Sequence, residues 1–503
     1  MSAPDNRNMS RAVVIGAGFG GIGAALRLRA RGYRVTVVDK QDKLGGRGYA
    51  YNRNGFIYDA GPTVITAKFL LEELFALFGK NIADYVELCP VTPWYRIRFH
   101  DGTHFDYGGT LEETLAEIRR IEPADADGYL RLLEKTKKIF DIGFTQLADQ
   151  PFDKFSTMLK ILPDFVSLKS YETVWQHTAR YIRNDKLRRV FSFQPLLVGG
   201  NPFTTTSIYS MIQYLEREWG VHFAMGGTGA LVAALGRLMQ EEGIEIRLNE
   251  TVEEVLVENG RATGVALAGG RRIPADIVVS NADVPYLYKH MIKPEHRRKW
   301  TDRRVDRQKY SMGLFVLYFG ARRTYPNLAH HTILLTERYR GLINDIFDGT
   351  KLPDDFSLYL HAPTRTDPSM APPGCESMYV LSPVPNLQAD IDWSVAGPRY
   401  AQAIIRYLEE TVCPDLRQHI TEEFYVAPDH FEKNLLSVRG SGFSIQPIFT
   451  QSAYFRFHNR SEDVQNLYVV GAGTHPGAGM PGVLSSAKVL DRVVPPPVRV
   501  GAG

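Results

Sequence analysis

Three glycines near the start of the chain have the spacing of a phosphate-binding turn, Gly16-x-Gly18-x-x-Gly21. The apolar run 12–15 before them predicts a strand, and residues from about 21 to 30 predict a helix. In such a turn Gly16 makes the tight bend, Gly18 lets the backbone approach a pyrophosphate, and Gly21 allows close packing of helix on strand. The helix N-terminus then offers free N–H groups and partial positive charge to the phosphates. The segment therefore predicts a dinucleotide site.

An acidic residue stands where the ribose of such a dinucleotide would lie. Residues 33–38 predict the second strand of a βαβ unit, and Asp39 follows it, eighteen residues after Gly21. A carboxylate there can accept hydrogen bonds from both ribose hydroxyls, and its charge disfavours a 2′-phosphate. A glycine-rich turn can also be purely structural, but with its strand, helix and acid in place the pattern favours a dinucleotide other than NADP.

Two further glycine-rich segments can serve the same ligand. Gly45-Gly46-Arg47 follows the βαβ unit directly, and its planar cation can bind pyrophosphate oxygens, although a surface turn with an ordinary arginine is the alternative. Near the other end, residues 466–470 predict a strand, a glycine loop follows, and a helix begins near Gly482. A glycine backbone can approach a flat ring closely, and the helix N-terminus can stabilise negative charge on that ring.

These segments resemble known flavoenzymes. The run from Gly16 to Arg47 resembles the N-terminal signature of the glutathione-reductase-like FAD superfamily, in its amine-oxidase and desaturase branch. Further segments, from about residue 12 to 492, are similar to bacterial-type phytoene desaturases. These segments are Phe56-Ile57-Tyr58-Asp59-Ala60-Gly61-Pro62-Thr63-Val64-Ile65-Thr66, Leu197-Val198-Gly199-Gly200-Asn201-Pro202-Phe203, Trp219-Gly220-Val221, Gly226-Gly227-Thr228-Gly229, Gln451-Ser452-Ala453-Tyr454-Phe455-Arg456, His458-Asn459-Arg460 and Gly471-Ala472-Gly473-Thr474-His475-Pro476-Gly477-Ala478-Gly479-Met480-Pro481-Gly482-Val483.

The resemblance implies FAD as cofactor and stepwise desaturation of phytoene, a C40 carotenoid precursor, towards neurosporene or lycopene. In such a reaction the flavin N5 atom takes a hydride, and a quinone or oxygen is the terminal acceptor. No catalytic acid or base is assigned, and His475 in the glycine loop is given a positioning role. The residues that the resemblance places around FAD are Gly16, Gly18, Gly21, Asp39, Gly45, Gly46, Arg47, Gly61, Pro62, Thr63, Val252, Asn281, Gly471, Gly473, Met480, Gly482 and Val483.

Three positions depart from the usual pattern of that family. Asp39 stands where glutamate is common, Gly48 where alanine is common, and Phe457 where proline is common. Aspartate reaches less far than glutamate, so the first change bears on the ribose contact. The other two bear on specificity at most.

The expected fold class is α/β, with a discontinuous, Rossmann-like FAD-binding domain of the glutathione-reductase type. The domain is expected to be discontinuous because both ends of the chain meet around one cofactor. Strand patterns at 311–319, 356–361 and 378–382 indicate a second sheet in a substrate domain. The assigned ranges are 1–90, 221–285 and 452–503 for the FAD-binding domain, 91–110 and 286–451 for the substrate domain, and 111–220 for a helical insertion.

The helical insertion also predicts contact with a membrane surface. Between Pro151 and Arg189, aromatic and aliphatic residues are interleaved with eight basic and four acidic residues, a local net charge of +4. Near an anionic bilayer each basic residue contributes about 1 kcal/mol, although a solvated face over an ordinary core is the alternative. A long hydrocarbon is nearly absent from water, since its burial is favourable by about 25 cal/mol per Å². A tunnel from the membrane face to the flavin is therefore expected.

Composition excludes several other classes. With 59 basic and 56 acidic residues, the net charge of +3 gives no field that would attract nucleic acid. The three cysteines lack CxxC spacing, so neither a disulfide framework nor a metal site is expected. The first eleven residues lack the apolar core of a signal peptide, and no apolar stretch reaches the roughly 20 residues of a membrane span. The expected location is the cytoplasm, peripherally attached to the membrane, and the oligomeric state is not predicted.

Alternatives remain within and outside the enzyme class. A sister desaturase or an isomerase acting on another carotenoid would share most of these motifs. Amine oxidases and protoporphyrinogen oxidases share the nucleotide half, but the tracts 59–66 and 471–483 fit the desaturase branch better. A carrier that binds isoprenoids without redox chemistry uses a related fold, and it would differ by failing to bind flavin.

Overall fold

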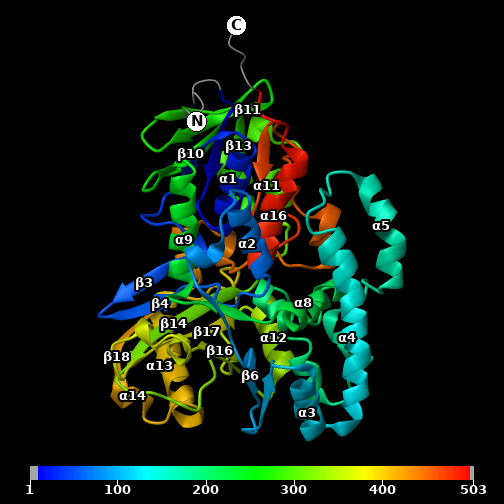
Figure 1. The fold of residues 1–503 in the computed structure, drawn as a ribbon, viewed down its shortest axis with the longest axis vertical. Helices are drawn as coiled ribbons and strands as arrows, with labels where there is room; N and C mark the ends of the chain where they lie inside the picture. Colours follow the sequence, from blue (N-terminus) through cyan, green and yellow to red (C-terminus); the bar gives the residue numbers. More distant parts are fainter. Residues whose placement is uncertain (1–8, 499–503) are drawn as a thin grey trace.

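A five-stranded parallel sheet organises the upper half of the molecule in Figure 1. The computed structural model describes residues 9–498. Residues 1–8 and 499–503 lie outside that range, and so does most of the N-terminal segment in which no signal peptide is expected. The strand order is β19-β13-β1-β2-β9, so segments from both ends and from the middle of the chain pair side by side. The strands are β1 (Arg11–Ile15), β2 (Arg34–Val38), β9 (Glu245–Arg247), β13 (Ile277–Ser280) and β19 (Leu467–Val469).

Both faces of this sheet are covered, which explains its continuous apolar strands. Four of the five residues of β1 are buried, as is expected for a parallel strand packed on two sides. Helices α1 (Phe19–Ala30), α9 (Gly227–Glu241) and α16 (Met480–Val493) form a core with one face. An antiparallel sheet covers the other face. Its strands are β10 (Val252–Glu258), β11 (Arg261–Leu267) and β12 (Arg272–Pro274).

Two helices begin earlier than the sequence pattern predicts. Helix α1 starts at Phe19 rather than near residue 21, because Gly18 is still extended (φ −74°, ψ 175°) and caps the first turn. Helix α16 starts at Met480 rather than Gly482, directly after Gly479 at φ +90°. Each helix therefore begins two residues before its predicted start, so that Gly21 and Gly482 lie inside the first turn.

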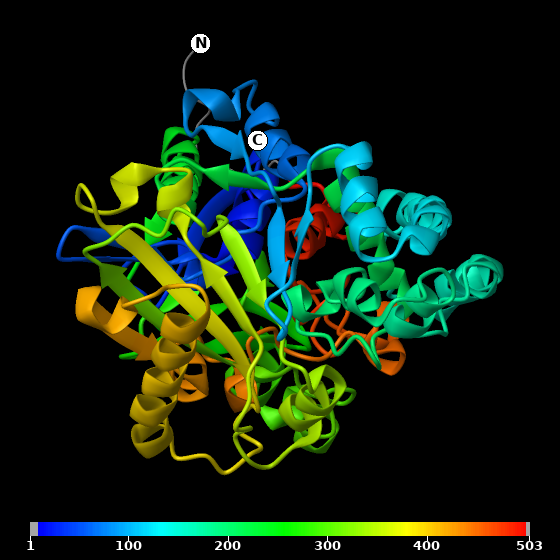
Figure 2. The same cartoon turned by 90° about the horizontal axis from the view of Figure 1, so that it is seen from below.

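A seven-stranded, mostly antiparallel sheet forms the lower half, and Figure 2 shows it from below. Its order is β18-β14-β17-β16-β15-β6-β7, and only the β15–β6 pair is parallel. Helix α13 (Trp393–Thr411) packs on one face, while the other face turns towards the centre of the molecule. The strands are β6 (Tyr95–Arg98), β7 (His104–Tyr107), β14 (Gly313–Ala321), β15 (His331–Leu334), β16 (Leu358–His361), β17 (Glu376–Val384) and β18 (Ile420–Val426).

Small elements connect the two halves. A hairpin of β3 (Ala50–Arg53) and β4 (Phe56–Asp59) runs from the parallel sheet to strand β17, and β5 (Leu88–Pro90) pairs with β8 (His222–Ala224). The α/β class expected from the sequence is confirmed. The remaining helices of these halves are α2 (Lys68–Ala76), α10 (Val284–Tyr286), α11 (Asp302–Asp306), α12 (Tyr339–Asp348), α14 (Leu416–His419) and α15 (Pro428–Leu435).

The region 111–220 is helical and lies along one side of the molecule. Helix α5 stands at its outer edge, on the right in Figure 1. Within the part of the chain that the structure describes, no helix combines the length and apolar character needed to cross a bilayer. The helices of this region are α3 (Leu111–Ile121), α4 (Ala126–Phe140), α5 (Phe155–Ser167), α6 (Val174–Ala179), α7 (Asp185–Val190) and α8 (Met211–Trp219).

Candidate active site

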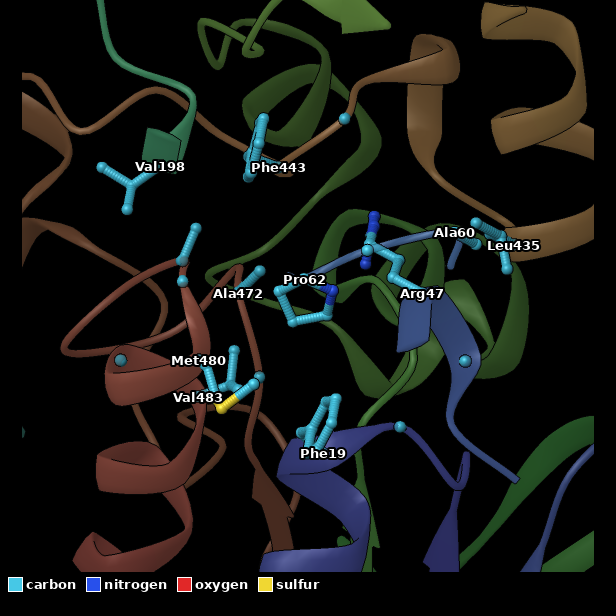
Figure 3. Close-up of a pocket in the computed structure, with 18 of the residues that line it drawn as sticks. Phe19, Arg47, Ala60, Pro62, Val198, Leu435, Phe443, Ala472, Met480 and Val483 are labelled. Carbon is cyan, nitrogen blue, oxygen red and sulfur yellow. The ribbon is translucent and has the colours of Figure 1, made fainter. Parts of the chain in front are cut away.

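One cavity of about 620 Å³ runs between the two sheets and contacts nearly every predicted site residue. Figure 3 shows side chains from α1, α16, the 45–62 segment and the second half of the chain around the same space. Gly21 and His475 do not line it. The predicted residues that do are Gly16, Gly18, Asp39, Gly45, Gly46, Arg47, Gly61, Pro62, Thr63, Val252, Asn281, Gly471, Gly473, Met480, Gly482 and Val483.

The glycine turn between β1 and α1 leaves no room for side chains. A Cβ on Gly21 would lie 1.9 Å from the Gly16 carbonyl oxygen, so Gly21 serves helix packing behind the cavity wall. A Cβ on Gly18 would lie 2.9 Å from Nδ2 of the Asn281 side chain. Gly16 itself has φ +90°, a conformation that favours glycine. The turn thus presents bare backbone at the N-terminus of α1, as binding of a pyrophosphate requires.

Asp39 braces this turn. Its Oδ2 accepts the N–H of Ala17 at 2.6 Å and its Oδ1 accepts the N–H of Gln41 at 2.8 Å. Burial raises the pKa of the carboxyl, although the two N–H donors oppose the shift. Each oxygen keeps a further lone pair, so the contact with ribose hydroxyls stays a prediction.

Arg47 reaches the cavity from the second glycine segment. The N–H of Gly45 donates to the carbonyl of Ala17 at 2.8 Å, which joins the two glycine segments. The guanidinium donates to the hydroxyl of Ser437, while its buried Nε has no hydrogen-bond partner among the residues described. Burial lowers its pKa and the nearby Asp283 opposes that shift. A buried cationic donor without a partner is suited to a phosphate oxygen.

The C-terminal glycine loop closes the opposite side. Asn281 lies between the two glycine segments, since a Cβ on Gly471 would lie 2.8 Å from its Oδ1. The first turn of α16 has no side-chain cap, and Met480, Gly482 and Val483 line the cavity there. Uncapped N–H groups at a helix N-terminus stabilise negative charge.

Arg456 holds this loop in place, a role that the sequence did not reveal. Its side chain is only 1% exposed and donates to four carbonyls, including those of Ala472 at 2.6 Å and Thr474 at 3.0 Å. An arginine buried among carbonyls satisfies many acceptors at once and fixes the path of the loop.

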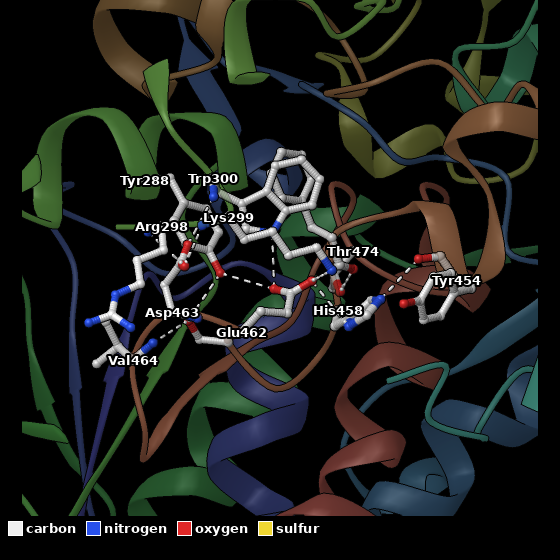
Figure 4. Close-up of polar contacts among 12 residues, drawn as sticks. Tyr288, Arg298, Lys299, Trp300, Tyr454, His458, Glu462, Asp463, Val464 and Thr474 are labelled. Carbon is white, nitrogen blue, oxygen red and sulfur yellow. Dashed lines mark hydrogen bonds and ion pairs between the residues drawn. The ribbon is translucent and has the colours of Figure 1, made fainter. Parts of the chain in front are cut away.

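A polar cluster beside this loop reinforces the same segment (Figure 4). The Asp463 carboxylate accepts three backbone N–H groups at 2.7–3.0 Å, from 298 to 300. Glu462 accepts the indole N–H of Trp300 at 2.9 Å. The Thr474 hydroxyl donates to the carbonyl of Phe457 at 2.6 Å, which connects the cluster's segment to the glycine loop.

His475 points away from the cavity. Its Nε2 lies 3.0 Å from the carbonyl oxygen of Leu147, and its ring packs against Phe152 at 4.6 Å between centroids. Burial lowers the pKa of its imidazole to about 4, so the ring is neutral at pH 7. The position joins the glycine loop to the helical insertion, and the positioning role stays a prediction.

The far end of the cavity is built from aromatic and aliphatic side chains. Thr63 marks the junction, because its hydroxyl lies 2.8 Å from the hydroxyls of both Tyr359 and Tyr379. The side chains around this end come from the seven-stranded sheet and from the helical insertion. They include Phe193, Leu196, Leu197, Tyr209, Met312, Leu314, Tyr318, Ile333, Tyr359, Tyr379, Leu381 and Phe443.

One carboxyl group lies among these apolar side chains, and no sequence pattern predicted it. Glu216 on α8 is fully buried and lines the cavity. Burial raises its pKa to about 7, against hydrogen bonds from Tyr95 at 2.8 Å and Gln194 at 3.5 Å and the nearby charge of Arg217. A buried carboxyl that titrates near neutral pH can hold or release a proton.

Comparison with known proteins decides the family. A model of the flavin containing amine oxidoreductases matches residues 19–489. The chain belongs to this family. This flavin containing amine oxidoreductase is 48% identical over 481 residues to a phytoene desaturase (lycopene-forming) of Pseudescherichia vulneris, across 95% of this chain and 98% of that protein. It is 42% identical over 497 residues to a phytoene desaturase (neurosporene-forming) of Rhodobacter capsulatus, across 98% and 95%.

Solved structures share the fold of this amine oxidoreductase. An oxidoreductase from Methanosarcina mazei superposes with a TM-score of 0.65 at 17% identity, across 96% of this chain and 100% of that one. The predicted similarity to bacterial carotenoid desaturases is confirmed. The predictions of a flavin-dependent oxidoreductase and of FAD as its cofactor are confirmed as well.

The residues of this amine oxidoreductase fit FAD at one end of the cavity. A Cβ on Gly18 would narrow the glycine cradle, and the buried Arg47 Nε lacks a partner within residues 9–498. Two helix N-termini, those of α1 and α16, lie on this lining. The first suits a pyrophosphate and the second suits the ring end of the cofactor.

Proposed function

We propose that this chain is a phytoene desaturase that introduces successive double bonds into phytoene, towards neurosporene or lycopene. The observation that carries the proposal is one continuous cavity with a glycine-lined end and an apolar, tyrosine-lined end. The relatives named above act on phytoene by their printed names, and they cover nearly the full chain. The apolar end offers a long hydrocarbon a dry site beside the cofactor.

In this proposal the FAD-binding domain is Rossmann-like and discontinuous. The sixteen predicted residues that line the cavity bind FAD, and Gly21 keeps the helix close to the turn behind them. Bound FAD supplies the acceptor for the hydride that leaves a saturated carbon. The chain's own residues orient the substrate, exclude water and handle the proton that leaves the neighbouring carbon. Glu216 lies at the apolar end, and its raised pKa allows it to take up that proton near neutral pH. Faces of Tyr318 and Tyr379 offer electron-rich surfaces to positive charge developing on the polyene.

The direct test mixes purified protein with FAD, phytoene-loaded liposomes and an oxidised quinone under nitrogen, followed by chromatography of the pigments. We expect coloured polyenes only when FAD is present, and their conjugation length separates neurosporene from lycopene. Replacing the quinone by air tests oxygen as the acceptor. Bound flavin without phytoene turnover would point to a sister enzyme for another carotenoid. A protein that stays colourless with excess FAD would favour the isoprenoid carrier.

We further propose that helix α5 attaches the protein peripherally to a membrane. Four apolar residues on this helix, Phe155, Leu159, Leu162 and Val166, are 47–56% exposed. They recur at helical spacing and form one outward stripe. Phe165 on α5 packs against Phe449 at 5.2 Å between centroids, and Phe449 is itself 42% exposed, which widens the apolar patch. An exposed apolar surface of this kind is typical of an interface with a membrane or partner.

Fewer basic residues than the local net charge of +4 suggests are free to contact a membrane. In the second half of the stretch 151–189, three of the five basic residues form ion pairs within the protein: Arg180 with Glu172, Lys186 with Asp101, and Arg189 with Asp185. Lys154, Lys160 and Lys169, on and beside α5, are exposed and accompany the apolar stripe. The attachment is therefore carried by apolar burial, with a smaller electrostatic contribution.

Replacing Leu159 and Leu162 by glutamate tests the attachment. Two apolar side chains lose burial and two negative charges are added, so we expect liposome binding to fall at least about tenfold, or 1.4 kcal/mol. Co-sedimentation with anionic vesicles measures it. Val395→Glu on α13, equally exposed at 51% but outside the patch, is the control that should bind normally. Equal loss in the control would contradict the proposal.

A further inference from the structure

Three histidines form a buried cluster at the edge of two paired strands. His330 directly precedes β15, His331 begins that strand, and His361 ends β16, where it pairs with His331. Their exposed fractions are 4%, 0% and 0%. The ring centroids lie 4.4 Å apart for His330 and His331, 4.9 Å for His330 and His361, and 5.4 Å for His331 and His361. Three buried imidazoles in mutual contact call for a physical reason.

The hydrogen bonds of these rings leave one side of the cluster without partners. Nδ1 of His330 lies 2.6 Å from the Thr366 hydroxyl, and Nδ1 of His331 lies 2.7 Å from the Tyr359 hydroxyl. The Nε2 atoms of His330 and His331 and both nitrogens of His361 are buried and find no partner in the described part of the chain. An unsatisfied buried polar group costs about 1–3 kcal/mol, so four of them indicate a missing ligand.

The three rings bring nitrogen atoms close together. One nitrogen from each ring lies within 4.8 Å of the others. A neutral imidazole has one ring nitrogen with a lone pair that can bind a metal ion. An imidazole that donates its Nδ1–H to a hydroxyl directs that lone pair from Nε2, which is the arrangement of metal-binding histidines and their supporting partners.

Asp59 supplies a fourth donor from another element. It ends β4, is 1% exposed, and its Oδ2 lies 3.8 Å from Nε2 of His361. Its Oδ1 accepts the N–H of Thr228 at 2.9 Å, while Oδ2 has no hydrogen-bond partner within residues 9–498. The carboxylate is thus held at one oxygen and aimed at the cluster with the other.

We propose that His330, His331, His361 and Asp59 bind one divalent transition-metal ion of the zinc class. Imidazole nitrogens with one carboxylate oxygen form a common tetrahedral zinc environment, with ligands at about 2.0–2.2 Å. Donor atoms around such an ion are about 3.3 Å apart. Binding would therefore draw together the three nitrogens, now within 4.8 Å of one another, and the Asp59 Oδ2, now 3.8 Å from Nε2 of His361. Four protein ligands leave no open position, so the ion is structural.

The ion would join segments that are far apart in the sequence. It would fix β4 of the connecting hairpin to β15 and β16 of the seven-stranded sheet. It would also orient Tyr359, whose hydroxyl contacts His331 on one side and Thr63 on the other and which lines the cavity. The site itself stands behind the cavity wall and does not depend on which substrate the enzyme uses.

The first test measures metal in untagged, full-length protein produced with Zn²⁺ in the medium. We expect about one zinc per chain by mass spectrometry of the digested protein. X-ray absorption at the zinc edge should show only nitrogen and oxygen neighbours, with the scattering pattern of imidazole rings. A zinc content below about one tenth per chain, with no rise in melting temperature on adding Zn²⁺, would overturn the proposal.

Matched variants then locate the ion. His361→Gln should lower zinc content at least about tenfold while the flavin absorbance of the purified protein persists. His177→Gln removes another buried histidine, outside the cluster, and should leave the zinc content unchanged. Tyr359→Phe, a milder change behind His331, should weaken zinc retention against a chelator about 10–100-fold and serves if His361→Gln fails to fold. Zinc content that follows His177 instead, or that survives both His361→Gln and Tyr359→Phe, contradicts the site.

Discussion

The two ends of the cavity are built from different materials. The cofactor end consists of backbone, exposed by glycines such as Gly16, Gly18 and Gly471 that lie in short contiguous segments. The substrate end consists of side chains, contributed one at a time by distant strands and helices. Backbone cradles tolerate almost no added atom, whereas a wall of many side chains loses function gradually. Substitutions should therefore act sharply at the first end and in graded fashion at the second.

The largest effect is expected from Gly21→Ala. The added methyl would lie 1.9 Å from the Gly16 carbonyl oxygen, so helix and turn must separate. We expect FAD affinity to fall at least about 1000-fold, or 4 kcal/mol, and the protein to purify colourless. Flavin fluorescence titration measures the dissociation constant. Gly341→Ala on α12, where the neighbours are atoms of the flexible Arg338 side chain, should bind FAD normally.

Arg456→Met should have the second-largest effect, because the C-terminal glycine loop loses the hydrogen bonds that hold it in place. Four carbonyls lose a donor, and the free energy of unfolding should fall by about 3–5 kcal/mol. Thermal unfolding with and without FAD measures the loss. Arg460→Met removes an exposed arginine with one such bond at 3.0 Å and should cost under about 1 kcal/mol. Equal losses would refute the special role of Arg456.

Glu216→Gln tests whether the buried carboxyl at the substrate end makes the free energy of unfolding depend on pH. The folded protein raises the pKa of Glu216 to about 7, so the unfolded chain loses its proton first as pH rises. The wild type should thus lose about 3 kcal/mol of stability between pH 4.5 and 7, relative to the variant. Denaturant unfolding at several pH values measures it. Glu218→Gln, exposed on the same helix, should retain the wild-type slope, and FAD binding should persist in both.

Tyr318→Leu should give the smallest effect. The ring lines the cavity and stacks on Phe424 at 4.6 Å between centroids, yet many other side chains share that wall. We expect kcat/KM for phytoene to fall about tenfold, or 1.4 kcal/mol, with FAD affinity unchanged. Tyr425→Leu is the control. Tyr425 follows Phe424 in the chain but packs on Phe315 in the core under α13, so its replacement should change stability without changing kcat/KM.

The same contrast explains what the sequence could predict. The cofactor end could be predicted because Gly16, Gly18 and Arg47 belong to short local motifs whose spacing indicates phosphate binding. The role of Glu216 could not be predicted, because nothing in its own segment distinguishes it from other helical glutamates. Its side chain is buried by residues such as Tyr95 that are far away in the chain. Arg456 was part of a motif, but its four carbonyl partners depend on the path of the loop.

The histidine cluster was missed for a related reason. The chain has only three separated cysteines, so cysteine spacing indicates no metal site. His331 and His361 become neighbours only through the pairing of β15 with β16, and Asp59 joins them only through the connecting hairpin. Such sites depend on sheet register, which short sequence patterns do not specify.

The parallel sheet has a consequence for how the protein is made. Its central strand β1 is synthesised before the other four strands of the sheet, β19 is synthesised after the rest, and α16 follows β19; Arg31 hydrogen-bonds to Leu490, 459 residues away. At about 5–20 residues per second, translation of the chain takes roughly 25–100 s. Until that time the nascent chain exposes an unfinished apolar sheet and cannot retain flavin. The sheet and the cofactor end of the cavity can therefore be completed only after α16 has been synthesised.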